Sequence, residues 1–184
     1  YDKFCDALVE ETKKLKIGDA KDNPNMGPVV NEKSKNSITN YIKKAIDEGG
    51  KLIHGGMELS EKGYYIQPTI IKDVERDATI AQEEIFGPVL AVIKSKNFDD
   101  GLEIANNTVF GLTGAVYTKH KKKLEKAEKE FYVGNLYLNR KCTGALVGVH
   151  PFGGFNMSGT DSKAGGRDYL GLFLQAKSIA QKVK

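Results

Sequence analysis

The chain has 184 residues, enough for one domain with a hydrophobic core. Its 28 basic and 24 acidic residues give a net charge of +4, too small an excess to predict a nucleic-acid surface. No apolar run approaches the roughly 20 residues of a membrane span, so we expect no membrane partner. The start at Tyr1 has no initiator Met and no signal peptide, which predicts a piece of a longer protein. Two distant cysteines, Cys5 and Cys142, favour a reducing, cytoplasmic compartment.

Two amphipathic helices are expected at the start of the chain. Residues 2–16 place Cys5 on an apolar stripe, so this cysteine is predicted to be a packed thiol. After Asn31, a plausible N-cap, apolar side chains recur at helical spacing from Ile38 to Ile46. The pair Gly49-Gly50 ends this helix. Strands are expected next, at residues 51–54, 64–71 and 89–93.

The second half alternates helix and strand: a helix at 98–106, a strand at 113–117, a helix at 121–131 and a strand at 135–139. Short connections between such elements are typical of parallel βαβ units. We therefore predict the α/β class, as one three-layer domain with a largely parallel central sheet and helices on both faces. This domain is expected to span residues 1–171.

The last residues, 172–184, form a separate segment in this prediction. Residues 172–183 alternate well enough to predict a strand at the C-terminus. A strand there leaves an unpaired edge unless a partner covers it. We expect it to serve as an assembly strand that pairs with another chain or domain.

The first chemical motif runs from Gln82 to Val89 and places two carboxylates, Glu83 and Glu84, beside the ring of Phe86. A carboxylate in such a turn can accept hydrogen bonds from two neighbouring hydroxyls, as acidic residues do on nucleotide riboses. From the residue pattern alone, a solvated pair of carboxylates before a strand is the favoured alternative.

The second motif is the segment 134–140, which contains the strand expected at 135–139, and the third is residues 143–159 of the long glycine-rich loop at 141–166. Gly144 and Ala145 leave the backbone open to close approach, and successive N–H groups there can form an anion-binding nest. Phe152 stands between a proline and two glycines, a ring on a stiff stem. The alternative is a structural loop packed on a neighbouring domain. Neither glycine-rich stretch matches a dinucleotide fingerprint or a phosphate-binding loop.

The motifs Glu84-Ile85-Phe86-Gly87-Pro88, Gly134-Asn135 and Pro151-Phe152-Gly153-Gly154 with Ser158-Gly159 occur in an order and spacing that resemble the aldehyde dehydrogenase family. The resemblance covers essentially the whole chain and points to the C-terminal half of the catalytic domain. Residues 139–166 are similar to one group in it, the bacterial 1-pyrroline-5-carboxylate dehydrogenases. That similarity implies NAD-dependent oxidation of L-glutamate γ-semialdehyde to L-glutamate in proline degradation, by a homo-oligomer.

The resemblance also implies roles for individual residues. Glu84 would bind the ribose on the nicotinamide side of NAD, and Phe86 would pack against the cofactor. Gly144 and Ala145 would offer backbone N–H groups to the α-carboxylate of the substrate. Phe152 would line the aldehyde tunnel.

The family's nucleophilic cysteine, its general-base glutamate and its Rossmann NAD domain lie upstream of this segment, so we expect all three to be absent from the chain. No catalytic residue is assigned, and the chain alone is expected to be inactive and to bind NAD weakly or not at all. No metal site is predicted, because His54, His120 and His150 have no partners at ligand spacing.

Two other hypotheses stay open from the sequence. The chain could be a non-catalytic α/β interaction module that assembles through its C-terminal strand. It could also be a separate enzyme that uses Cys142, which lies near the predicted substrate anchor but has no obvious base beside it.

Overall fold

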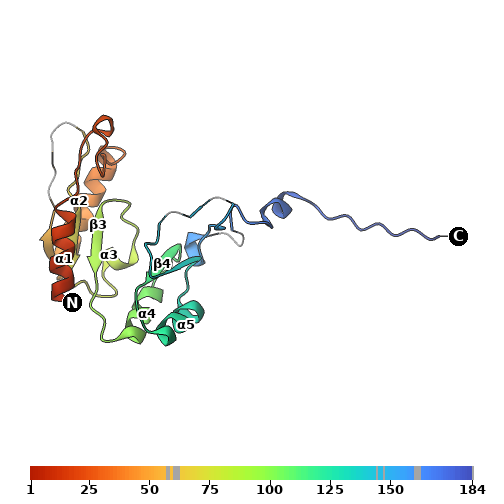
Figure 1. The fold of residues 1–184 in the computed structure, drawn as a ribbon. Helices are drawn as coiled ribbons and strands as arrows, with labels where there is room; N and C mark the ends of the chain where they lie inside the picture. The colour runs from red at the N-terminus through yellow and green to blue at the C-terminus, as the bar shows by residue number, and fades with distance from the viewer. Residues whose placement is uncertain (57–58, 60–62, 144, 147, 160–162, 184) are drawn as a thin grey trace. The chain divides into compact units, whose positions relative to one another are not determined.

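The computed structural model describes residues 1–56, 59, 63–143, 145, 146, 148–159 and 163–183. The chain divides into two compact units, Tyr1–Asn107 and Thr108–Lys184 (Figure 1). The elements of the first unit are α1 (Asp2–Thr12), η1 (Ala20–Asp22), α2 (Glu32–Asp47), β1 (Lys51–His54), β2 (Thr69–Lys72), α3 (Thr79–Gln82), β3 (Val89–Val92) and α4 (Phe98–Asn106). Those of the second unit are β4 (Thr113–Val116), α5 (Lys121–Glu130), β5 (Asn135–Leu138), η2 (Asn156–Ser158) and η3 (Tyr169–Phe173).

Helix α2 supplies much of the core of the first unit. The side chain of Asn31 accepts a hydrogen bond from the Ser34 amide at 2.8 Å, which confirms the predicted N-cap. The helix buries one face, and Gly49 follows it with a φ of 97°. The buried residues that pack together in this core are Ile38, Ile42, Ala45, Ile66, Ile71, Val74 and Ile80.

The three strands of the first unit form a mixed sheet in the order β1-β2-β3. Strand β2 pairs with β3 in parallel, as expected, whereas β1 pairs with β2 antiparallel. Parallel neighbours need a crossover between them, usually a helix, and no helix lies between β1 and β2 in the described part of the chain. The antiparallel pair is therefore the arrangement that this connection permits.

The second unit contains the βαβ element that the sequence predicts. Strands β4 and β5 pair in parallel, from Thr113 opposite Asn135 to Val116 opposite Leu138, and α5 connects them. Helix α5 buries Ala127, and β5 buries the side chain of Tyr137. The α/β class and these parallel pairs are confirmed, while the strands divide between two sheets.

The C-terminal segment differs from its prediction. Within this chain residues 172–183 form no strand: Tyr169–Phe173 is a short 3-10 helix, and residues 174–183 have no regular secondary structure. The side chains of Leu174, Ile179 and Val183 are exposed. A strand exists only beside a hydrogen-bonded neighbour, which no other segment of the described chain supplies here. Pairing with another chain stays a prediction.

One helix and one strand are shorter in the structure than predicted, whereas the prediction for Cys5 is confirmed. The first helix ends at Thr12, and the strand expected at 64–71 is limited to the four residues of β2. Cys5 is 2% exposed, which confirms the packed thiol. None of the described helices is long and apolar enough to cross a membrane.

Ile71 provides a test of the core of the first unit. Its side chain is fully buried in β2, so Ile71→Ala should leave a cavity and lower the free energy of unfolding by about 2–5 kcal/mol. Val30→Ala removes apolar atoms from a side chain that is 80% exposed and should change the stability little. Urea denaturation of the 184-residue chain measures both. Equal effects of the two substitutions would contradict this core.

Candidate functional site

The segment predicted to contact a cofactor lies between α3 and β3. Glu84 and Phe86 are both exposed, the ring of Phe86 to 84%. Phe86 has a φ of 56°, a left-handed conformation that a bulky residue adopts only at an energetic cost. An exposed aromatic ring held in this conformation is therefore a candidate contact surface.

The two carboxylates of this motif have different surroundings. Glu83 accepts a hydrogen bond from the Tyr41 hydroxyl on α2 at 2.7 Å, and this contact raises the pKa of Tyr41. Glu84 has no hydrogen-bond partner among the described residues and is exposed. Glu83 therefore matches the structural interpretation, and Glu84 is an exposed carboxylate that water or a ligand can reach.

Gly87 allows this segment to approach α2 closely. A Cβ at position 87 would lie 2.5 Å from the Cδ1 atom of Ile38, a distance that real Cβ contacts do not reach. Ile85 packs against the same core. The close contact at Gly87 and the packed side chain of Ile85 hold the backbone on both sides of Phe86.

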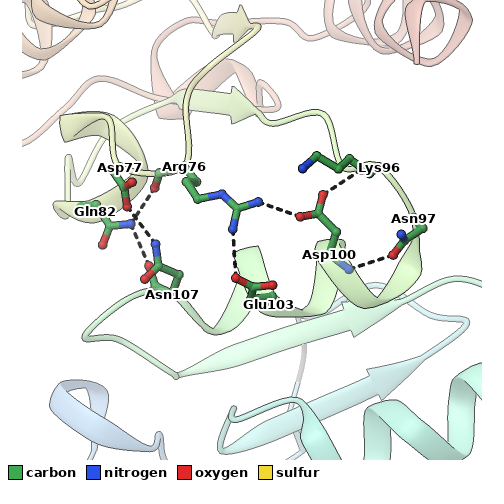
Figure 2. A network of polar contacts seen from close by, with 8 residues as sticks. All are labelled: Arg76, Asp77, Gln82, Lys96, Asn97, Asp100, Glu103 and Asn107. Atoms are coloured by element: carbon green, nitrogen blue, oxygen red, sulfur yellow. Dashed lines mark hydrogen bonds and ion pairs between the residues drawn. The ribbon is translucent and has the colours of Figure 1, made fainter.

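Helix α3, which precedes the motif, is held at both ends. Glu48 accepts hydrogen bonds from the Thr79 amide at 2.8 Å and from the Thr79 hydroxyl at 2.6 Å. These bonds lower the pKa of Glu48. At the other end, the side-chain amide of Gln82 donates to the carbonyl oxygens of Arg76 and Asn107, each at 2.7 Å (Figure 2). Glu84 and Phe86 therefore follow a helical turn that is fixed at its first and last residues.

A polar network centred on Arg76 connects this region to α4 (Figure 2). Arg76 forms ion pairs with Asp100 at 2.7 Å and with Glu103 at 3.1 Å. Asp100 also accepts from the Lys96 amide at 2.7 Å, and its own amide donates to the Asn97 side chain at 3.0 Å. The Lys96 amide first, and the Arg76 guanidinium second, hold the pKa of Asp100 below its usual range.

The network predicts how acid affects the first unit. Because the pKa of Asp100 is depressed on folding, its contribution to stability is present above about pH 4, near the ordinary pKa of an aspartate. It is lost as the pH falls through the lower, folded pKa. Asp100→Asn should therefore destabilise the chain at pH 7, and the difference from the wild type should shrink below about pH 4.

Unfolding of the 184-residue chain by urea at a series of pH values measures this effect. Asp6→Asn, on the exposed side of α1, is the control and should lower the stability much less at neutral pH. A difference between wild type and Asp100→Asn that stays constant down to pH 2 would contradict the assignment.

In the second unit, the two remaining motifs contact each other through the backbones of their glycines. Any Cβ at Gly134 would overlap the carbonyl oxygen of Gly153, and any Cβ at Gly159 would overlap that of Gly154. The Gly111 amide donates to the Ser158 hydroxyl at 3.0 Å, and the Gly111 carbonyl accepts from the Gly134 amide at 2.8 Å. These contacts explain why the motifs carry glycine at these positions.

The backbone around Phe152 is held from two directions. Asn135, the first residue of β5, donates to the Pro151 carbonyl at 2.9 Å and accepts from the Gly153 amide at 3.1 Å. The amide and carbonyl of Phe152 pair with Ala164 at 2.9 and 2.8 Å. The Lys163 ammonium donates to the Gly153 carbonyl at 2.6 Å.

Beside this loop is a cavity of about 560 Å³. It is lined by Cys142, Thr143, Ala145, His150, Phe152, Ala164 and Gly165. The predicted substrate residues Ala145 and Phe152 therefore share one cavity, while Gly144 lies outside the described residues. The Ala145 amide donates no hydrogen bond to the described residues, so this donor is left for a ligand.

His150 is a cavity residue that the sequence did not indicate. Its Nδ1 accepts a hydrogen bond from the Leu146 amide at 3.2 Å, which closes a turn in the loop. Cys142 is an exposed free thiol on the same cavity wall. The sequence shows that Cys142 lies near the predicted substrate anchor. That Cys142 and His150 line one cavity depends on how the loop folds. Among the described residues, no group of three or more His, Cys, Asp or Glu side chains could hold a metal ion.

The order and geometry of these motifs can be compared with known proteins. The model of the aldehyde dehydrogenase family matches residues 1–179. The chain belongs to the aldehyde dehydrogenase family. Among family members, the 1-pyrroline-5-carboxylate dehydrogenase of Geobacillus sp. (strain WCH70) is 56% identical over 182 residues, 98% of this chain. That of Bacillus subtilis (strain 168) is 54% identical over the same length. The chain spans 35% of the length of each relative.

Solved structures of aldehyde dehydrogenases agree. The structure of 1-pyrroline-5-carboxylate dehydrogenase from Thermus with bound NAD matches with a TM-score of 0.94 and 49% identity. The match covers 97% of this chain and 34% of that one. Betaine aldehyde dehydrogenase from Staphylococcus aureus in complex with NAD+ matches with a TM-score of 0.81 and 31% identity, over 89% of this chain and 33% of the other.

Proposed function

We propose that this chain is part of an NAD-dependent dehydrogenase that oxidises L-glutamate γ-semialdehyde, the open form of 1-pyrroline-5-carboxylate, to L-glutamate in proline degradation. The observation that carries the proposal is the cavity of the second unit, where the Ala145 backbone and the Phe152 ring line one space. An amino-acid aldehyde carries a carboxylate, and this group needs hydrogen-bond donors in the binding site to replace the water that it loses. A backbone N–H that donates to no described residue supplies such a match, because it binds the carboxylate without a countercharge.

The substrate contacts follow from this cavity. The N–H groups of Gly144 and Ala145 bind the α-carboxylate, and Phe152 covers the aliphatic part of the substrate. A general aldehyde dehydrogenase needs only an apolar tunnel, whereas this loop combines an apolar lining with the Ala145 N–H, which donates to no described residue. The combination favours a short aldehyde that ends in a carboxylate.

The cofactor contacts lie in the first unit. An exposed carboxylate and an exposed ring, two residues apart on a fixed turn, fit a ribose and the face of a nucleotide ring. Glu84 accepts hydrogen bonds from the two ribose hydroxyls, and Phe86 packs against the cofactor. NAD, if bound here, would supply the hydride acceptor for the oxidation. The residues of this chain orient the cofactor and bind the substrate.

The nucleophilic cysteine and the general-base glutamate belong, in this proposal, to parts of the enzyme outside these 184 residues. The elements of the chain then contribute to a three-layer α/β catalytic domain with a largely parallel sheet. Cys142 is an exposed thiol that takes no part in the reaction.

The exposed apolar side chains at the C-terminus support a role in assembly. Leu174, Ile179 and Val183 are between 75% and 88% exposed, and together they form an apolar segment that a partner could cover. We propose that residues 172–183 become a strand on a second copy of the enzyme, which gives a homo-oligomer. The two unpaired cysteines fit a cytoplasmic location.

A hybrid enzyme tests the proposed activity. Residues 1–184 replace the matching third of the Bacillus subtilis relative, and reduction of NAD by glutamate γ-semialdehyde is followed at 340 nm. We expect the hybrid to be active and the 184-residue chain alone to show no turnover. A folded, assembled hybrid without activity would contradict the proposal. Turnover by the chain alone that Cys142→Ser abolishes would instead favour a separate enzyme.

Ala145→Val in the hybrid tests the substrate. A β-branched side chain should displace the backbone donors from the carboxylate, and charge-assisted hydrogen bonds of this kind contribute about 1.5–3 kcal/mol. The KM for glutamate γ-semialdehyde should therefore rise roughly tenfold or more. The rate with propanal, which has no carboxylate, should change much less. Equal losses with both aldehydes would make the loop a general structural element, and no loss would place the carboxylate elsewhere.

A further inference from the structure

Phe152 stands in an unusually well-fixed stretch of backbone. Five consecutive polar groups, from the Pro151 carbonyl to the Gly153 carbonyl, all have hydrogen-bond partners. Asn135 binds the first and fourth, Ala164 the second and third, and Lys163 the fifth. Such complete pairing is ordinary in a sheet, but here it occurs in a loop. The ring of Phe152 is therefore left with little freedom beyond its own side-chain rotation.

Asn135 is the partner that comes from a rigid element. It is the first residue of β5 and lies opposite Thr113 of β4, with its own amide bonded to the Leu112 carbonyl at 3.1 Å. Ala164 and Lys163 belong to the same long loop as Phe152. Asn135 is thus the side chain that attaches the loop to the sheet.

The orientation of the Asn135 amide follows from its two partners. Its NH₂ group faces a carbonyl oxygen, and its oxygen faces an N–H group. A rotation of the amide by half a turn would set two acceptors against each other, and two donors likewise. No other neutral side chain of this length offers a donor and an acceptor in the same plane to partners two residues apart.

We propose that Asn135 is a positioning residue that fixes the Phe152 ring in the substrate cavity and so sets the affinity for the substrate. The inference rests on the proposed function, because it takes the cavity of Ala145 and Phe152 as the substrate site. Asn135 contacts the backbone on either side of the ring, and it acts through Phe152 alone.

The chain offers a matched control in Asn139, which immediately follows β5. It makes the same pair of bonds to a different loop: its oxygen accepts from the Thr118 amide at 2.9 Å, and its NH₂ group donates to the Thr118 carbonyl at 3.1 Å. Thr118 does not line the cavity. Asn135→Asp and Asn139→Asp each keep the acceptor and replace the donor with an oxygen that faces a carbonyl.

The test is a double-mutant cycle in the full-length enzyme that contains these residues, or equally in the hybrid. Asn135→Asp should raise the KM for glutamate γ-semialdehyde about tenfold and change kcat by less than about threefold. In a Phe152→Ala background, the same substitution should raise KM by less than about twofold, because the ring through which it acts is gone. Asn139→Asp should have the same small effect in both backgrounds.

Asn135→Ser is a second variant in case the aspartate prevents folding, because its short hydroxyl cannot reach both partners but introduces no charge. It should show the same loss of effect when Phe152 is removed. An effect of Asn135 that persists fully in the Phe152→Ala background would overturn the inference and leave the proposed function intact. A folded full-length enzyme with no activity on the semialdehyde would overturn both.

Discussion

Close backbone contact at Gly134 is the constraint on which the second unit depends. The loop after β5 returns across the start of that strand at a distance where a single Cβ would overlap the Gly153 carbonyl. Only glycine permits this approach. The contact brings Asn135 within hydrogen-bond distance of both neighbours of Phe152, and it brings the Ser158 hydroxyl to the Gly111 amide. The cavity beside this loop can form because the loop itself is tied to the sheet by these contacts.

The first unit uses the same device in a different place. Gly87 lets the segment of Glu84 and Phe86 lie against Ile38 of α2, and the hydrogen bonds of Glu48 and Gln82 hold the preceding turn. In both units the residues assigned to ligands stand on irregular backbone, and regular elements supply the side chains that fix it. Loops carried by a rigid scaffold are the usual location of binding residues. Here the connection between scaffold and loop can be followed bond by bond.

Sequence reasoning predicted the elements with strong local signals. Helix α2 with its Asn31 cap, the βαβ element of the second unit and the packed Cys5 all follow from side-chain spacing. Helix α3 has only four residues, which is about one helical turn and too short to show a repeating apolar pattern. The sequence therefore did not predict it. The antiparallel pairing of β1 with β2 was also not predicted, because it depends on which strands lie side by side. The alternating pattern of residues 172–183 predicts a strand only beside another chain or domain, and that pairing stays a prediction.

In the candidate site, too, local sequence patterns were predictive and contacts between distant segments were not. Glu84, Phe86, Ala145 and Phe152 were predicted from ordered motifs and a family resemblance, and their roles stay predictions. The different environments of Glu83 and Glu84 depend on Tyr41, which lies 42 residues away. The place of His150 in the cavity and the two bonds of Asn135 likewise depend on segments that meet only after folding. Such contacts leave no periodic trace in the sequence.

The left-handed backbone of Phe86 has a consequence for the evolution and engineering of this chain. At an exposed position with a φ of 56°, asparagine or glycine has a lower conformational energy than phenylalanine. Little packing is lost when an 84% exposed ring is removed. Selection for thermal stability alone would therefore drift away from the aromatic residue. A library screened only for heat resistance would accumulate variants at position 86 that fold better but lack the exposed ring that we propose packs against the cofactor.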